Sequence, residues 1–143
     1  MDEIEKPTRT SDVALKQEAE ALSLAGKLAL VVDDDPDLRA YVRTILEAAG
    51  CRILVAKDGA AALEVIAREP PDVVLLDIRM PGLSGDEVLD LLALVERHPP
   101  VIVMTAARRA RERALHHHNR YYLPKPFDSA LLIATVETAL EVG

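Results

Sequence analysis

Polar side chains follow three short apolar runs in this chain, and their types suit the binding of charged ligands. Runs of valine, isoleucine and leucine that alternate with helical patterns indicate buried parallel strands, and the carboxyl ends of parallel strands meet at one edge of a sheet. The runs, each with the polar residues that follow it, are Leu28–Val32 with Asp33, Asp34 and Asp35, Val73–Leu76 with Asp77, and Val101–Met104 with Thr105. We therefore expect these side chains to converge.

Carboxylates that converge in this way repel one another and need a compensating charge. Two of them about 4 Å apart repel by roughly 4 kcal/mol at an effective dielectric constant near 20. Protons, a lysine such as Lys125, or a bound cation can offset that repulsion. A hard divalent cation prefers oxygen ligands, so the cluster predicts a metal site.

The rest of the pattern predicts the elements that position these residues. Strands are expected at Leu28–Asp33, Arg52–Ala56, Asp72–Asp77, Val101–Thr105 and around Tyr121–Leu123. A helical pattern follows each strand, and three helix starts carry capping residues: Asp35 with Pro36, the capping-box pair Ser84 and Glu87, and Asp128. Alternating strands and helices joined by short turns form right-handed crossovers, which predicts a doubly wound α/β sheet with five helices covering both faces.

Length and composition fit one compact domain with an appendage. The chain has 143 residues, of which 50% are hydrophobic, and this is enough for a single core. We divide it into an N-terminal extension, residues 1–26, and a domain, residues 27–143. Within the extension Leu15, Ala19 and Leu22 recur at helical spacing, which leaves a docked helix and a loose linker both open.

Charge and cysteine content argue against several classes of protein. The net charge of -7 does not supply the basic surface that binding nucleic acid requires. No run of about 18 apolar residues predicts a membrane-spanning helix, and the polar start Met1–Thr10 lacks the apolar core of a secretory signal. The single cysteine, Cys51, cannot form an internal disulfide. We therefore expect a soluble, unprocessed protein of the reducing cytoplasm.

Four stretches carry a more specific pattern. They are VVDDDPDLR at Val31–Arg39, VVLLDIRMPGLSGDEV at Val73–Val88, VIVMTA at Val101–Ala106 and YLPKPF at Tyr122–Phe127. In order and spacing these stretches resemble the receiver domain of two-component response regulators, over about residues 27–142. The resemblance implies a flavodoxin-like (CheY-like) five-stranded parallel sheet of strand order 2-1-3-4-5.

The same resemblance implies roles for the polar residues. Asp77 matches the phosphoacceptor, and Lys125 would pair with the phosphoryl group. Asp34 and Asp77 would bind Mg²⁺ directly, the main-chain carbonyl of Arg79 would add a ligand, and Asp33 would act through a bound water. A carboxylate can attack phosphorus when the charge on the transferring group is neutralised, and Mg²⁺ prefers a few carboxylates together with phosphate oxygens.

Two further residues match the positions that change on phosphorylation in this family. Thr105 matches the hydroxyl that bonds the phosphoryl oxygens, and Tyr122 matches the aromatic side chain that turns inward behind it, with Tyr121 as a competing candidate. The resemblance also implies a cis peptide bond between Lys125 and Pro126, which sequence statistics alone would not favour. Ordinary strand-forming or core roles stay open for the threonine and the tyrosines.

The stretch between Thr105 and Lys125 departs from the family pattern. It is shorter than usual, and it lacks the glycine that normally ends the fourth helix. That glycine adopts a left-handed backbone conformation, which Asn119 can adopt in its place. Five arginines against one glutamate make this expected helix basic, which favours an acidic partner or a different dimer, although a solvated helix face fits as well. The consecutive histidines 116–118 point about 100° apart on a helix and cannot chelate one ion together.

Arg79 lies two residues after Asp77 and is both bulky and cationic. We therefore predict that it alters the rate of dephosphorylation.

Taken together, the sequence predicts a phosphoacceptor signalling domain rather than an enzyme. It would accept a phosphoryl group on Asp77 from a histidine kinase or histidine phosphotransfer protein, and it would assist its own phosphorylation and dephosphorylation. Signalling to a downstream protein would use residues 106–142, which span the expected fourth helix, fifth strand and last helix. Whether the chain forms a homodimer is left open.

Two other functions remain as alternatives. A pseudo-receiver would share the fold and act as a binding module that never uses phosphorylation. A phosphatase of the haloacid dehalogenase type would need an aspartyl nucleophile at the first strand and a second aspartate two residues later, a spacing that Asp33 and Asp35 satisfy. Pro36 and the run LLDIRMPG argue against this phosphatase.

Overall fold

The computed structural model describes residues 23–95, 98–106 and 121–142. Three expectations lie outside the described residues. They are the choice between a docked helix and a loose linker around Leu15, Ala19 and Leu22, the basic helix predicted after Thr105, and the proposed cap at Asn119. None of the helices in these described ranges combines the length and the apolar character that crossing a bilayer requires.

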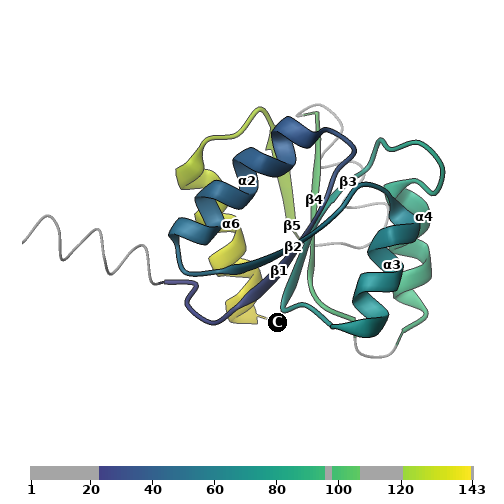
Figure 1. Cartoon of the computed structure of the whole chain (residues 1–143), viewed down its shortest axis with the longest axis horizontal. Coiled ribbons are helices and arrows are strands. Elements are labelled where there is room, and N and C mark those ends of the chain that lie inside the picture. Colours follow the sequence, from purple (N-terminus) through teal and green to yellow (C-terminus); the bar gives the residue numbers. More distant parts are fainter. Residues whose placement is uncertain (1–22, 96–97, 107–120, 143) are drawn as a thin grey trace, which may run out of the picture.

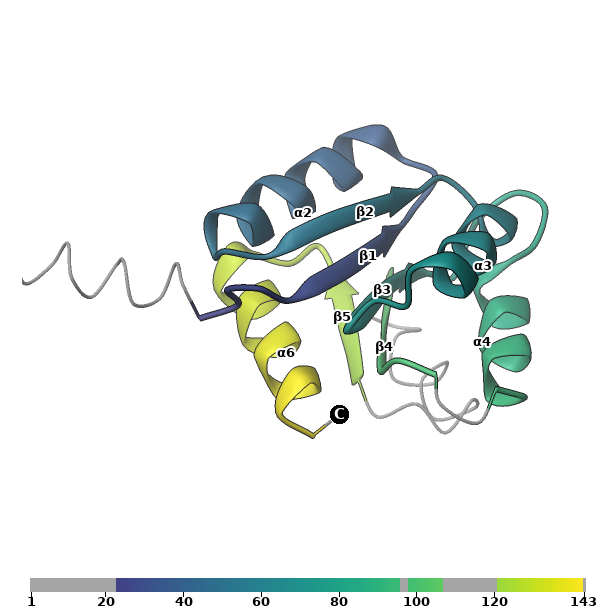
Figure 2. The same ribbon diagram turned by 60° about the horizontal axis from the view of Figure 1, so that its bottom comes forward.

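A five-stranded sheet forms the centre of the molecule. Its strands are β1 (Leu28–Val32), β2 (Arg52–Ala56), β3 (Val73–Asp77), β4 (Val101–Ala106) and β5 (Tyr121–Lys125). All neighbouring pairs are parallel and the order is β2-β1-β3-β4-β5. Figure 2 shows β1 and β2 running side by side in the same direction. The predicted fold class and strand order are therefore confirmed, and all five strands end at the same edge.

Helices cover both faces of this sheet. They are α2 (Pro36–Ala48), α3 (Gly59–Arg68), α4 (Gly85–Ala93) and α6 (Ser129–Val142). In Figure 1, α2 and α6 lie on one face and α3 and α4 on the other, as right-handed crossovers require. The described part of the chain thus holds four of the five predicted helices, and the prediction for the remaining one falls between Thr105 and Tyr121, outside the described residues.

The predicted capping residues begin the helices that they were assigned to. The Asp35 carboxylate accepts a hydrogen bond from the Asp37 amide at 2.9 Å, directly before Pro36 at the first helical position. Ser84 and Glu87 form the reciprocal capping box, with both bonds at 3.2 Å. Asp128 accepts from the Leu131 amide at 2.8 Å. These local hydrogen bonds fix the first residue of each helix. The residues between a strand end and that helix start are then available for a functional side chain.

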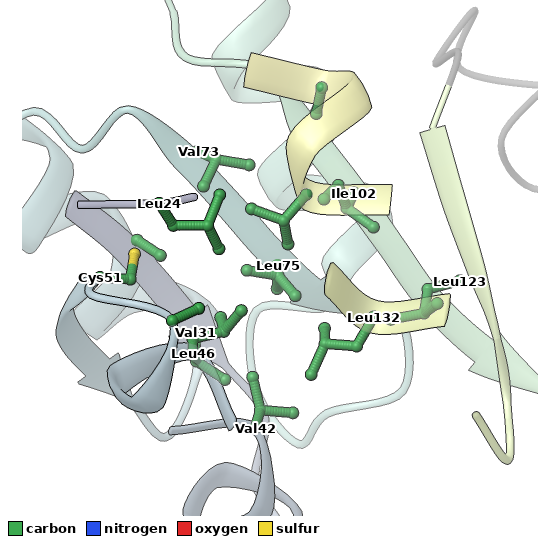
Figure 3. Close-up of a cluster of buried hydrophobic side chains, with 14 of the residues drawn as sticks. Leu24, Val31, Val42, Leu46, Cys51, Val73, Leu75, Ile102, Leu123 and Leu132 are labelled. Carbon is green, nitrogen blue, oxygen red and sulfur yellow. The ribbon is translucent and has the colours of Figure 1, made fainter. Parts of the chain in front are cut away.

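Side chains of the central strands alternate between two apolar cores. On the α2 and α6 face, the cluster drawn in Figure 3 includes Leu24, Val31, Val42, Leu46, Cys51, Val73, Leu75, Ile102, Leu123 and Leu132. On the α3 and α4 face, a second cluster includes Leu30, Val32, Val74, Leu76, Val88 and Val103. Because both faces are buried, the central strands are apolar throughout, which explains their uninterrupted runs in the sequence.

The first of these cores reaches back into the stretch that we assigned to the N-terminal extension. Leu24 is 1% exposed, and its amide donates a hydrogen bond to the Ala49 carbonyl at 3.1 Å. Beside it the Cys51 thiol is buried, and burial raises its pKa to about 11, with a smaller contribution from the charge of Asp72. Cys51 therefore packs as a small apolar residue that stays protonated.

Candidate functional site

Three acidic side chains come together where β1 and β3 end. Asp33 and Asp34 follow β1, and Asp77 is the last residue of β3, its neighbour in the sheet. One oxygen of each carboxylate can be chosen so that all three lie within 4.8 Å of one another. The structure thus brings together the three carboxylates that the sequence placed at the ends of different strands.

Asp33 is held on every side. It is 1% exposed, its Oδ1 accepts a hydrogen bond from the Asp35 amide at 2.9 Å, and its Oδ2 lies 3.0 Å from Lys125 Nζ. Its backbone amide donates to the Ala56 carbonyl at 3.2 Å, and its own carbonyl accepts from Arg39 Nη1 at 2.7 Å. A buried carboxylate with this many partners is fixed in direction before any ligand arrives.

Asp77 is also buried, at 5% exposed, but its charge is less well compensated. Its Oδ1 lies 3.4 Å from Lys125 Nζ and accepts a hydrogen bond from the Arg79 amide at 3.3 Å. Burial raises the pKa of Asp77, and the neighbouring charge of Asp33 raises it further, while Lys125 and the Arg79 amide act in the opposite direction. The pocket therefore has more negative charge than its one lysine can offset.

Asp34 differs from the other two because its side chain is exposed to solvent. Three carboxylates and one ammonium leave a formal charge of -2 at the pocket, which a divalent cation would neutralise. Carboxylate oxygens are hard ligands, and a site that is open on one side leaves room for waters or phosphate oxygens. The donor set therefore fits Mg²⁺, with Asp33, Asp34 and Asp77 as the side chains that would hold it.

Lys125 reaches this cluster from the far edge of the sheet. It is the last residue of β5, which is separated from β3 by β4, and its side chain is 30% exposed. The peptide bond between Lys125 and Pro126 is cis, as the resemblance implied. One ammonium thus joins the ends of β1, β3 and β5.

Thr105 and the two tyrosines lie on the strands beside this pocket. Thr105 is 4% exposed near the end of β4, and it pairs with Pro124 of β5. Tyr122 is 40% exposed, whereas Tyr121 is half-buried and packs against the core on the α2 and α6 face. The difference in packing favours Tyr122 as the tyrosine that is free to change position, although its role as a switch stays a prediction.

Sequence reasoning missed the close approach of Gly85 to the pocket. A Cβ at Gly85 would meet the Asp77 carbonyl oxygen and lie 2.6 Å from the Cα of Ile78. The Gly85 amide also donates to the Ile78 carbonyl at 3.1 Å. The start of α4 is therefore pressed against the backbone that carries Asp77, and a glycine in the first turn of a capped helix was the signal in the sequence.

A hollow beside Lys125 was also not predicted. It has a volume of about 480 Å³ and is lined by Asp35, Leu38, Tyr41, Ala106, Lys125, Pro126 and Phe127. The rings of Tyr41 and Phe127 lie 6.3 Å apart between centroids, and Tyr41 is 43% exposed. A mostly apolar hollow thus adjoins the acidic pocket on the side where α2 begins.

Comparison with known proteins places these features in one family. The family model described as the response regulator receiver domain matches residues 29–137. The chain is 42% identical over 114 residues to the DNA-binding transcriptional regulator NtrC of Escherichia coli, which covers 77% of this chain and 24% of NtrC. It is 39% identical over 113 residues to the response regulator MprA of Mycobacterium leprae, covering 78% of this chain and 50% of MprA.

Solved structures agree with the sequence relatives. The receiver domain of NtrX from Brucella abortus superposes with a TM-score of 0.74 at 32% identity, covering 80% of this chain and 99% of that domain. The chain thus spans between a quarter and half of these curated relatives, but nearly the whole of a separately solved receiver domain.

Proposed function

The chain belongs to the response regulator receiver domain family, and from that premise we propose that it accepts a phosphoryl group on Asp77, with Mg²⁺, from a histidine kinase or phosphotransfer protein. The observation that carries the proposal is the cluster of Asp33, Asp34 and Asp77 joined by Lys125. This set holds a nucleophile, candidate metal ligands and a cation within one pocket.

The contacts of Asp77 support its role as the nucleophile. Both the Lys125 ammonium and the Arg79 amide contact Oδ1, which leaves Oδ2 as the oxygen that would attack phosphorus. In the transfer, a bond forms between this oxygen and phosphorus, the bond between phosphorus and the donor imidazole breaks, and the imidazole nitrogen leaves with the electron pair. Bound Mg²⁺ would supply positive charge beside the phosphoryl oxygens.

Lys125 and Thr105 would act on the phosphoryl group once it is in place. The ammonium already lies between two carboxylates, so it is positioned to pair with phosphoryl oxygens that arrive on Asp77. Thr105 is one residue beyond Met104, which pairs with Asp77 in the sheet, and its hydroxyl would bond the same oxygens. In this role the chain is a signalling domain that assists its own phosphorylation and dephosphorylation.

Two hollows on the surface suit protein partners, and one of them adjoins the acidic pocket. The apolar hollow at Tyr41 and Phe127 adjoins Lys125, so a phosphodonor that covered it would bring its histidine to the acidic cluster. The second, of about 290 Å³, is lined by Tyr121, Tyr122, Leu131, Ala134, Thr135 and Thr138. It lies on the described part of residues 106–142, where we propose that the downstream partner binds.

Phosphorylation by acetyl phosphate tests the proposal directly. With Mg²⁺ present, intact-protein mass spectrometry should find one phosphoryl group that hydroxylamine removes on the wild-type chain and none on Asp77→Asn. Asp37→Asn is the matched control, because it removes the same charge from an exposed position in the first turn of α2. It should be labelled like the wild type.

The other outcomes separate the alternatives. Label retained on Asp77→Asn would mean that another residue is the acceptor. A wild-type chain that takes no label, and whose NMR spectrum does not respond to Mg²⁺ with beryllium fluoride, would favour a binding module that never uses phosphorylation. Turnover of a generic phosphomonoester would favour the phosphatase.

A further inference from the structure

One cationic side chain beside the acidic cluster, that of Arg39, donates a hydrogen bond to the backbone instead of to a carboxylate. Arg39 lies in the first turns of α2, close in sequence to four aspartates, yet its Nη1 donates to the main-chain carbonyl of Asp33 at 2.7 Å. This is the shortest of the hydrogen bonds described around the pocket. A charged donor on a neutral carbonyl makes a stronger bond than a neutral donor would.

The carbonyl that Arg39 holds controls the direction of the next residue. The peptide unit between Asp33 and Asp34 is planar, so fixing its oxygen fixes the plane from which the Asp34 backbone departs. The following turn is fixed as well, because the Asp35 amide donates to Asp33 Oδ1 at 2.9 Å. Asp34 therefore stands between two anchored positions.

Asp34 needs these anchors more than its neighbours do. Asp33 and Asp77 are buried, whereas the Asp34 side chain is exposed to solvent. Its place within 4.8 Å of the other two carboxylates thus depends on the backbone that carries it. We propose that Arg39 is a positioning residue that aims Asp34 at the metal-binding pocket, an inference that rests on the proposed function only for the presence of Mg²⁺ there.

The charge of Arg39 and its proposed positioning role predict opposite changes in Mg²⁺ affinity when Arg39 is replaced. The guanidinium is positive, so removing it should by charge alone strengthen the binding of a cation nearby. If its hydrogen bond positions Asp34, removing it should weaken that binding. Groups that orient metal ligands without touching the metal typically contribute about tenfold or more to metal affinity. The sign of the change in Mg²⁺ affinity therefore decides between the two effects.

Titration with Mg²⁺ alone measures this affinity without requiring phosphorylation. Amide NMR shifts of the labelled full chain give the dissociation constant, and the rise in melting temperature with added Mg²⁺ gives an independent estimate. We expect Arg39→Met, which keeps the stem and removes the charge and donors, to raise the dissociation constant by about tenfold. Arg39→Gln, which removes the charge and shortens the reach, should raise it as well.

Two variants complete the design. Arg39→Lys keeps a cationic donor and should restore the dissociation constant to within a few-fold of the wild type. Arg43→Met is the matched control, because Arg43 lies one turn further along α2 and makes only an exposed ion pair with Glu47 at 3.2 Å. It removes the same charge from the same helix and should leave the dissociation constant unchanged.

Unchanged or tighter Mg²⁺ binding by folded Arg39→Met would overturn the proposal, as would an Arg39→Lys variant no better than Arg39→Gln. If Arg39→Met does not fold, the comparison of Arg39→Gln with Arg39→Lys decides. A wild-type chain that binds no Mg²⁺ would overturn this inference together with the metal site. Mg²⁺ binding that depends on Arg39 in a chain that never takes label on Asp77 would refute the proposed function alone.

Discussion

The Asp77 carboxyl is harder to ionise in the folded chain than in an unfolded one. Burial is the largest cause of its raised pKa, and the charge of Asp33 is the next. A carboxyl whose pKa is raised on folding contributes stability that is fully present below its unfolded value of 3.8 and is lost as pH rises through the folded value. At neutral pH the ionised Asp77 therefore destabilises the metal-free fold.

Asp77→Asn should for this reason stabilise the metal-free protein at pH 7. The amide keeps the shape of the side chain without the buried charge, and Lys125 keeps Asp33 as a partner at 3.0 Å. We expect the melting temperature to rise by roughly 3 °C, on the order of 1 kcal/mol for a domain of this size. The gain should shrink as pH falls through the raised pKa of Asp77 toward 3.8, because the folded wild-type carboxyl takes up its proton above that value.

Circular dichroism melts of both chains across this pH range, without divalent cations, measure the effect. A melting temperature that falls by the same amount at every pH would mean that lost hydrogen bonds outweigh the relieved charge. Adding Mg²⁺ should stabilise the wild type more than the variant, since the variant lacks one of the proposed carboxylate ligands.

At the scale of single residues, sequence reasoning could place Asp33, Asp34, Asp77 and Lys125 because strand ends share an edge. It could not place the contact of Arg39 with the Asp33 carbonyl. A long guanidinium side chain can reach several acceptors, and only the folded structure shows which one it bonds.

Two helices begin with a glycine that is pressed against neighbouring backbone. At Gly59, the first residue of α3, a Cβ would lie 2.6 Å from the Leu83 carbonyl oxygen and 2.7 Å from Val88 Cγ2. Gly85, the first residue of α4, is equally close to the end of β3. The loop from Ile78 to Ser84, which includes Arg79, is thus confined by two helix starts.

Gly85→Ala should displace α4 from the strand that carries Asp77. The added methyl group would overlap backbone atoms, which have no side-chain freedom to move away. We expect a loss of roughly 2 to 3 kcal/mol in the free energy of unfolding. Urea denaturation measures this loss, and slower labelling of Asp77 by acetyl phosphate would accompany it.

Gly82→Ala provides the control for this substitution. Gly82 has a φ of 75° with nothing within 4 Å of the added Cβ, so it tests backbone conformation without overlap. It should cost only about 1 kcal/mol. Equal losses for the two variants would show that close packing at Gly85 does not matter.

The difference between caps and close contacts explains what could be predicted for the elements. Asp35, Ser84 and Asp128 bond to atoms two or three residues away, so their role is visible in the local sequence. The demand on Gly59 comes from Leu83 and Val88, which are distant in the sequence. The demand on Gly85 comes from Asp77 and Ile78, which precede it by eight and seven residues, so the glycine marks a close approach without showing which backbone it meets. The predicted fifth strand ended at Leu123, whereas β5 continues to Lys125 through Pro124, a residue that weakens a strand prediction.

Over the whole molecule, the apolar runs and the handedness of the crossovers could predict a doubly wound α/β sheet, whereas the strand order was implied by the resemblance to receiver domains. The position of the acidic side chains at one edge of the sheet followed from the parallel arrangement of the strands, because all parallel strands end at the same edge. The two hollows did not, since each depends on how side chains of different elements pack: the first lies between α2 and the end of β5, which are far apart in the sequence, and the second lies between β5 and α6.

Lys125 is the side chain through which a change at Asp77 would reach the rest of the molecule. Lys125→Ala should slow phosphorylation by no more than roughly a hundredfold, because the metal ligands remain. It should abolish the NMR shifts that phosphorylation produces at Thr105 and Tyr122, since β5 would lose its link to the acidic cluster. Lys57→Ala, at an exposed position just after β2, should change neither property.

A phosphorylated Lys125→Ala chain with wild-type shifts at Tyr122 would contradict this expectation. Phosphorylation that is lost altogether would instead assign the lysine to the transfer step. Comparing the two signals in one sample keeps these outcomes apart.

The position of β5 in the sheet has a mechanical consequence. Within the described part of the chain, β5 pairs with β4 alone, while the acidic side chains stand on β1 and β3, each of which has strands on both sides. A displacement of the Lys125 ammonium group would therefore act on one pair of hydrogen-bonded strands, β4 and β5. The strands that carry the carboxylates are each hydrogen-bonded to two neighbours. We therefore expect a phosphoryl group on Asp77 to shift β5 and the helix that follows it more than β1 and β3.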